Sequence, residues 1–240
     1  KFGWETRFVD ADDPANVHAA MDDKTRCVFV ESLANPGGVV TDIAAIADVA
    51  HDHGVPLIVD NTMATPMLCR PFEHGADIVT HSTTKFLNGH GNAVGGVIVD
   101  SGKFDWKAAG DKFPSLTQPN GSYHGAVLVD ALEPIGPIAF ITACRVLGLR
   151  DLGPAMAPQN AWLALTGMET LALRMERHCA NALAVAEWLE NHEQVAWVSY
   201  AGLETNAYKP LADRYLGGKG GAAFTFGLKG GYDAGVKLVS

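Results

Sequence analysis

Short runs of β-branched residues alternate with helical patterns through the first hundred residues of the chain. This alternation is typical of βαβ units, in which a crossover helix joins parallel strands of one sheet. We predict four strands, at residues 27–31, 56–60, 77–81 and 94–99. The sequence therefore predicts an α/β fold with a mostly parallel central sheet flanked by helices.

A crossover helix is expected between the first two strands. Ile43, Ile46, Ala47 and Ala50 recur there at helical spacing, with Thr41 as the expected N-cap. Further along, the helical pattern of residues 123–149 is interrupted by two prolines, so we predict two helices joined by a break.

A long helix follows, and its apolar residues share one face: Leu171, Met175, Cys179, Ala182, Ala186 and Leu189. Strands are predicted at 195–200 and 222–228, with a flexible glycine-rich loop before the second. We predict a large domain over residues 1–188 and the beginning of a smaller C-terminal α+β domain over 189–240.

Composition narrows the class of protein. The 240 residues are 48% hydrophobic and 19% charged, as in ordinary globular domains. Eighteen Lys and Arg against 27 Asp and Glu give a net charge of -9, which argues against nucleic acid or an anionic membrane as a partner. The four cysteines form no CxxC pair. With neither a signal peptide nor an apolar run near the roughly 20 residues that span a bilayer, we expect a cytoplasmic protein.

Three polar residues follow three predicted strands: Asn35, Asp60 and Lys85. In open α/β sheets the ligand crevice lies at the carboxyl ends of the strands. We therefore expect these three side chains to converge. The histidines form no HExxH motif and the glycines no GxGxxG motif, so neither a metal site nor a dinucleotide site is predicted.

Each of these residues has a chemical and a structural interpretation. A desolvated Lys85 would have a lowered pKa and form a Schiff base readily, whereas a loop lysine is often only a surface residue. Asp60 ends an apolar strand, where it could pair with a protonated pyridine nitrogen or cap the following turn. The hydroxyls of Ser82 and Thr84 could donate to a phosphate or simply form a turn.

The order and spacing of several runs resemble the Cys/Met metabolism enzymes that bind pyridoxal 5'-phosphate: Val59-Asp60-Asn61-Thr62, Ala64-Thr65-Pro66, His81-Ser82-Thr83-Thr84-Lys85-Phe86 and Gly89-His90-Gly91. The similarity runs from residues 7–10 through 30–36 to 173–178. It implies the fold of the aspartate aminotransferase-like (fold type I) transferases, with pyridoxal phosphate as cofactor and no metal. By resemblance, Lys85 holds the cofactor, Asp60 pairs with its ring nitrogen, Asn35 contacts its ring hydroxyl, and Ser82 and Thr84 bind its phosphate.

Within this family, residues 113–114, 122–125 and 149–153 resemble the O-acetylhomoserine sulfhydrylase branch, although such a segment can also only reshape a subunit contact. The resemblance implies a transferase of methionine biosynthesis. It would convert O-acetyl-L-homoserine and sulfide or a small thiol to L-homocysteine or methionine and acetate. Cystathionine γ-synthase, O-succinylhomoserine sulfhydrylase and methionine γ-lyase activities are the alternatives, as is a non-catalytic homologue that acts as an interaction protein.

The resemblance also implies a homotetramer for the full-length protein, in which a neighbouring subunit completes the phosphate site. Three features of the family are expected outside these 240 residues. They are a glycine-containing phosphate loop, a tyrosine that stacks on the cofactor ring and an arginine that binds the substrate carboxylate.

Overall fold

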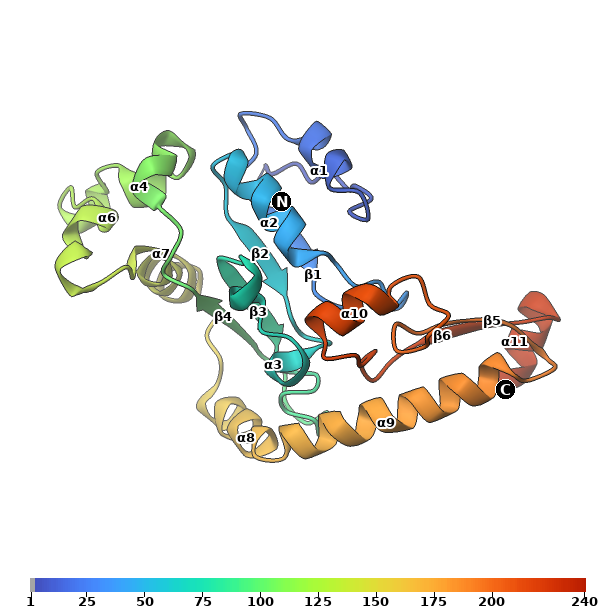
Figure 1. Cartoon of the computed structure of the whole chain (residues 1–240). Coiled ribbons are helices and arrows are strands. Elements are labelled where there is room, and N and C mark those ends of the chain that lie inside the picture. Colours follow the sequence, from blue (N-terminus) through green and yellow to red (C-terminus); the bar gives the residue numbers. More distant parts are fainter. Residues whose placement is uncertain (1–2) are drawn as a thin grey trace.

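A computed structural model describes residues 3–240, so the first two residues of the predicted large domain lie outside the described part. Its strands form two sheets (Figure 1). The larger has the order β1-β2-β3-β4, and β5 pairs with β6. The strands are β1 (Val28–Glu31), β2 (Leu57–Asp60), β3 (Ile78–Ser82), β4 (Gly96–Asp100), β5 (Val195–Ser199) and β6 (Thr225–Leu228).

The register of the larger sheet brings three strand ends to one edge. β1 runs parallel to β2, with Glu31 opposite Asp60. β2 runs parallel to β3, with Asp60 opposite Thr80. β4 is antiparallel to β3, with Ser82 opposite Gly96. The prediction of a mostly parallel sheet is confirmed, and the carboxyl ends of β1, β2 and β3 lie together.

Helices flank the larger sheet on both faces (Figure 1). The α-helices are α1 (Pro14–Ala20), α2 (Ile43–Asp52), α3 (Thr65–Leu68), α4 (Trp106–Ala109), α5 (Pro114–Thr117), α6 (Leu128–Ala131), α7 (Ala139–Ala143), α8 (Pro158–Met168), α9 (Leu171–Glu190), α10 (Lys209–Tyr215) and α11 (Gly231–Val239). Short 3-10 turns cover Pro71–His74, Gly110–Lys112, Gly121–Tyr123 and Glu133–Ile135, and a π-helical segment covers Cys144–Leu152.

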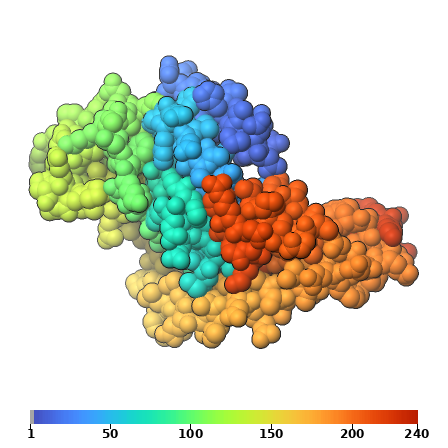
Figure 2. All heavy atoms as spheres, in the orientation of Figure 1, coloured from blue at the N-terminus to red at the C-terminus, as the bar shows by residue number. Residues whose placement is uncertain are grey.

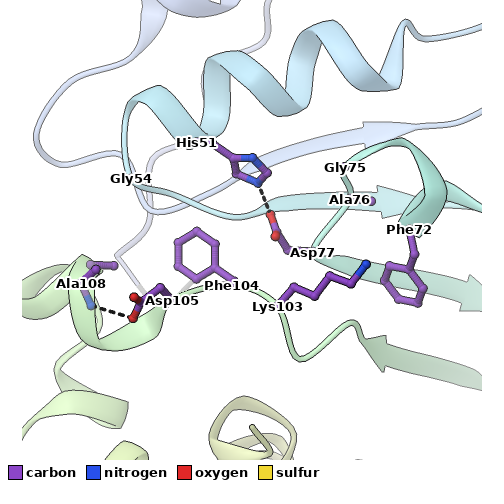
Figure 3. Close-up of a pocket in the computed structure, with 11 residues that line it drawn as sticks. His51, Gly54, Phe72, Gly75, Ala76, Asp77, Lys103, Phe104, Asp105 and Ala108 are labelled. Atoms are coloured by element: carbon purple, nitrogen blue, oxygen red, sulfur yellow. Dashed lines mark hydrogen bonds and ion pairs between the residues drawn. The ribbon is translucent and has the colours of Figure 1, made fainter.

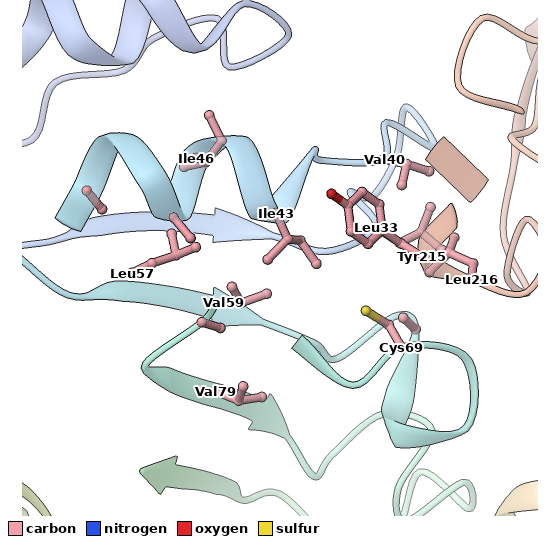
Figure 4. Packing of buried hydrophobic residues seen from close by; sticks show 14 of the residues in the cluster. Leu33, Val40, Ile43, Ile46, Leu57, Val59, Cys69, Val79, Tyr215 and Leu216 are labelled. Carbon is pink, nitrogen blue, oxygen red and sulfur yellow. The ribbon is translucent and has the colours of Figure 1, made fainter. Parts of the chain in front are cut away.

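Alternation along β2 sends side chains to two separate cores. Leu57 and Val59 pack against Ile43 and Ile46 of α2, and all four are fully buried (Figure 4). The intervening Ile58 faces the opposite side, where it packs with the cluster formed by β3 and the helices α4 to α7. A buried parallel strand needs apolar residues on both faces, and this sequence supplies them.

The crossover helix begins one residue later than predicted. Asp42 is the N-cap of α2, and its Oδ1 accepts a hydrogen bond from the amide of Ala45. The expected cap at Thr41 is wrong because that hydroxyl donates instead to the carbonyl of Glu31, at 2.7 Å. Thr41 therefore ties the start of α2 to the end of β1.

The break predicted in residues 123–149 is confirmed, because α6 and α7 are separate short helices. The long helix is α9, and the predicted apolar residues are its buried ones. β4 and β6 begin later than expected, at Gly96 and Thr225. The C-terminal helix α11 was not anticipated.

The C-terminal part of the chain projects to one side of the rest of the molecule (Figure 2). α9, β5 and β6 form most of this arm. The predicted domain boundary after residue 188 falls in the last turn of α9 and stays a prediction. Among the described residues no single helix is long and apolar enough to span a membrane. The segments Leu128–Ile135 and Ala139–Leu152 together have the length and composition of a span, but they are bent by 116° relative to each other.

Candidate functional site

Asp60 closes β2, and the turn that follows it holds its carboxylate in place. Oδ1 accepts a hydrogen bond from the amide of Thr62 at 2.8 Å. This is the turn-capping interaction weighed from the sequence. Within residues 3–240 nothing donates a hydrogen bond to the other carboxylate oxygen, so one oxygen of a half-buried Asp60 is available to a cationic ligand.

Thr62 joins the ends of β2 and β3. Its hydroxyl oxygen accepts a hydrogen bond from the amide of Ser82, at 2.8 Å. Ser82 is half-buried, and its own hydroxyl has no partner among the described residues. The Ser82 hydroxyl is therefore free to donate to a ligand at this edge.

Lys85 lies in the turn directly after β3. The turn is closed by hydrogen bonds from the Lys85 amide to the Ser82 carbonyl and from the Gly89 amide to the Lys85 carbonyl. The Lys85 side chain is exposed, so the expected desolvation is not found in this chain. The reason is its position past the end of the strand, where none of the described elements covers it.

The hydroxyl of Thr84 is occupied. Its Oγ1 accepts from the amide of Gly95 at 3.1 Å and donates to the Gly95 carbonyl at 3.3 Å. These bonds fasten the turn after β3 to the segment that enters β4. The predicted phosphate contact of Thr84 therefore competes with an existing structural role.

Asn35 is exposed in the loop after β1. The loop is closed by a bridge between Leu33 and Val40, and the Asn35 amide donates to Oε2 of Glu31 at 3.2 Å. The side-chain amide of Asn35 has no partner among the described residues, so it can turn toward a ligand at the strand ends.

His81 lies on β3 next to Ser82 and is almost fully buried. Burial lowers its pKa, and the charge of Asp60 opposes this effect. A lowered pKa keeps the imidazole neutral at neutral pH. Its Nδ1 is buried and has no hydrogen-bond partner in the described part of the chain.

A cavity of about 430 Å3 lies at the opposite edge of the sheet (Figure 3). Its lining includes His51 near the end of α2, Asp77 just before β3, and Lys103 and Phe104 beyond the end of β4. His51 Nε2 contacts Asp77 Oδ2 at 2.8 Å, and the same oxygen accepts from the amide of Leu57. This cavity contains none of the predicted site residues.

The site residues brought to one edge form a coherent set of groups. A lysine amine, a carboxylate, a side-chain amide and a hydroxyl match an aldehyde, a protonated ring nitrogen, a ring hydroxyl and a phosphate. Sequence reasoning missed one residue that supports this set, Thr62, which links the ends of β2 and β3. Its position directly after the Asp60-Asn61 pair was a usable signal.

A model of the family described as "Cys/Met metabolism PLP-dependent enzyme" matches residues 1–240, the whole chain. The chain belongs to this family. The cofactor of these PLP-dependent enzymes is pyridoxal phosphate, and the side chains at the strand ends suit it.

Several relatives within the Cys/Met metabolism family are similar to the whole chain. It is 50% identical to a homocysteine synthase of Schizosaccharomyces pombe, and the match covers 100% of this chain and 56% of that protein. It is 49% identical to an O-acetyl-L-homoserine sulfhydrylase of Leptospira meyeri, covering 100% and 55%. The chain therefore spans about half the length of these relatives.

A crystal structure has the same fold. It is assigned as an O-acetylhomoserine (thiol)-lyase of Campylobacter jejuni and contains N'-pyridoxyl-lysine-5'-monophosphate. The TM-score is 0.88 at 39% identity, with 95% of this chain and 56% of that chain covered. The predicted α/β fold of the PLP-dependent transferases is therefore confirmed.

Proposed function

We propose that this chain forms part of the cofactor site of a PLP-dependent O-acetylhomoserine sulfhydrylase. One observation carries the proposal: β2 and β3 bring Asp60, Ser82 and Lys85 to a common edge of the sheet. The names of the relatives support the branch, because they include a homocysteine synthase and an O-acetyl-L-homoserine sulfhydrylase at 49% identity or more.

Each residue has a role that follows from its chemistry. Lys85 Nζ is the nucleophile that holds the cofactor aldehyde. Asp60 keeps the ring nitrogen protonated through its available carboxylate oxygen. Asn35 binds the ring hydroxyl, and Ser82 donates to the phosphate. Thr84 reaches the phosphate only if its hydrogen bonds to Gly95 rearrange.

Pyridoxal phosphate, when bound, supplies an electron sink for negative charge at the substrate Cα. Once the substrate amine had displaced it from the cofactor, Lys85 Nζ would be the general base of this chain, taking a proton from the substrate Cα and returning protons in the second half of the reaction. In the net reaction the bond from Cγ to the acetate oxygen breaks and a bond from Cγ to sulfur forms. O-acetyl-L-homoserine and hydrogen sulfide thus become L-homocysteine and acetic acid.

The full-length protein is proposed to act as a homotetramer in the cytoplasm on this amino acid and sulfide or a small thiol. Residues outside this chain then complete the site, since the chain spans about half of its relatives. The family's usual tetramer supports a neighbouring subunit as one source of them.

The test is an assay of the purified full-length protein with pyridoxal phosphate, O-acetyl-L-homoserine and sulfide, with Lys85→Ala as control. Homocysteine should form in the wild type only. Parallel reactions with O-succinylhomoserine, with cysteine and without a thiol distinguish the alternative activities. Preference for one of those conditions would replace the proposal, and no turnover in any would favour a non-catalytic homologue.

A further inference from the structure

The segment that follows Lys85 contacts the α8–α9 corner, which is the end of α8 and the first turn of α9. Arg174, in the first turn of α9, directs its guanidinium group at this segment. Nη1 donates to the carbonyl of Phe86 at 2.8 Å, and Nη2 lies 3.5 Å from the carbonyl of Leu87. The two residues directly after Lys85 are thus bound through their backbone.

The same guanidinium group is anchored to its own corner. Nη2 also donates to the carbonyl of Gly167 in α8 at 2.8 Å, and Nε donates to the hydroxyl of Thr170 at 3.0 Å. Burial lowers the pKa of Arg174, but arginine stays charged at any accessible pH. Because Nη1 and Nη2 of the planar guanidinium group both make hydrogen bonds, the bound carbonyls have little freedom to move.

Two glycines allow the close approach of these elements. A Cβ on Gly89 would lie 2.5 Å from Cζ of Arg174, and Gly89 has a φ of +77°. A Cβ on Gly167 would lie 1.9 Å from the carbonyl oxygen of Asn88. A side chain at Gly167 would push helix and turn apart because it meets backbone atoms, whereas one at Gly89 would displace the Arg174 guanidinium group.

Apolar packing closes the same junction. Leu87 is buried with Leu171 and Met175 of α9, and the ring of Phe86 lies 5.7 Å from that of His178. The Lys85 carbonyl accepts the Gly89 amide, so the held residues are mechanically joined to Lys85 itself. A displacement of the segment 86–89 therefore moves the lysine backbone.

We propose that Arg174 is a positioning residue for Lys85, acting through the carbonyls of Phe86 and Leu87. The proposal rests on the proposed function, because the held lysine is the one that binds the cofactor. Lys85 is exposed, so packing of its own side chain does little to fix its position. The α8–α9 corner supplies that constraint from outside the site.

The experiment compares variants of the full-length protein for pyridoxal phosphate binding. Arg174→Met keeps a long apolar side chain and removes every donor. Gly167→Ala adds a Cβ on α8 that would clash with the Asn88 carbonyl of the turn after Lys85. Arg177→Met is the matched control, because Arg177 is an exposed arginine on the same helix with no hydrogen bond or ion pair among the described residues.

Three readouts are taken at a temperature where all variants are folded. They are the dissociation constant of pyridoxal phosphate, the pH midpoint of the visible absorbance of the lysine-bound cofactor, and the thermal midpoint of the apoprotein. Misplacing a reacting group by about 1 Å can lower the reaction rate about a hundredfold. We expect Arg174→Met and Gly167→Ala to weaken cofactor binding by at least about tenfold and to shift the pH midpoint. Arg177→Met should match the wild type.

Unchanged binding and pH midpoint in Arg174→Met would overturn the proposal, even with a lower thermal midpoint, because the arginine would then be only structural. If Arg174→Met does not fold, Arg174→Lys decides. It keeps the charge but cannot span the Phe86 and Gly167 carbonyls, so unchanged cofactor binding would overturn the proposal equally. A wild type without covalent attachment would instead refute the proposed function itself.

Discussion

The Thr62 hydroxyl oxygen accepts a hydrogen bond from the Ser82 amide at 2.8 Å, linking the turn after β2 to the last residue of β3. The Thr62 amide at the same time donates to Asp60 Oδ1. One threonine therefore sets the relative position of the carboxylate proposed for the ring nitrogen and the hydroxyl proposed for the phosphate.

Thr62→Val should remove this link without changing the shape of the side chain. The Ser82 amide then loses its acceptor in a half-buried position, which costs about 1–3 kcal/mol. We expect the urea midpoint of the full-length apoprotein to fall accordingly and cofactor affinity to fall with it. Thr62→Ser, which keeps the hydroxyl, should behave as the wild type. A loss in Thr62→Ser with none in Thr62→Val would show that packing of the methyl group matters instead.

Asp60→Asn should separate the two roles of Asp60. The asparagine oxygen can still accept the Thr62 amide, so the turn and the folding stability should be retained. The negative charge beside the ring nitrogen is lost, and removal of one preorganised electrostatic partner typically lowers turnover by about a hundredfold or more. Measured turnover close to the wild-type value would contradict the role proposed for this carboxylate.

The sequence predicted the strands that form this edge of the sheet because their signals are local. Asp60 and Lys85 follow apolar β-branched runs, and the buried face of α9 follows from its helical spacing. The Thr41 cap failed because two neighbouring residues could both cap α2, and only the contact of Thr41 with Glu31 decides between them. The hydrogen bond from Arg174 to the Phe86 carbonyl joins residues 88 positions apart in the sequence, and no local pattern predicts such a contact.

Asp77 should be more important to stability than its partner His51. Asp77 is buried, and its Oδ2 accepts both the Leu57 amide and His51 Nε2 at 2.8 Å. Asp77→Ala leaves the buried amide unpaired, so we expect a loss of about 1–3 kcal/mol in urea unfolding. The His51 side chain is 40% exposed, so His51→Ala should cost less than about 1 kcal/mol. The reverse order would show that the histidine dominates the pair.

Tyr215 should make stability depend on alkaline pH. Burial and a hydrogen bond to Asp42 raise its pKa to about 12, from an ordinary value of 10.0. The unfolded tyrosine loses its proton at lower pH than the folded one, so this contribution is intact below about pH 10 and disappears as the pH rises to about 12.

Urea unfolding of the wild type and Tyr215→Phe from about pH 9 to about pH 11.5 measures this contribution. The difference in unfolding free energy between the two proteins should narrow as the pH rises. A constant difference over that range would mean that the phenol titrates alike in the folded and unfolded states.

The central claim is that Lys85 holds the cofactor, and its most direct test is chemical. The full-length protein is incubated with pyridoxal phosphate, reduced with borohydride and digested, and the pyridoxyl group is located by peptide mapping. The wild type should show visible absorbance before reduction and a modified Lys85 after it, while Lys85→Ala shows neither. A pyridoxyl group on another lysine, or no modification in the wild type, would contradict the account.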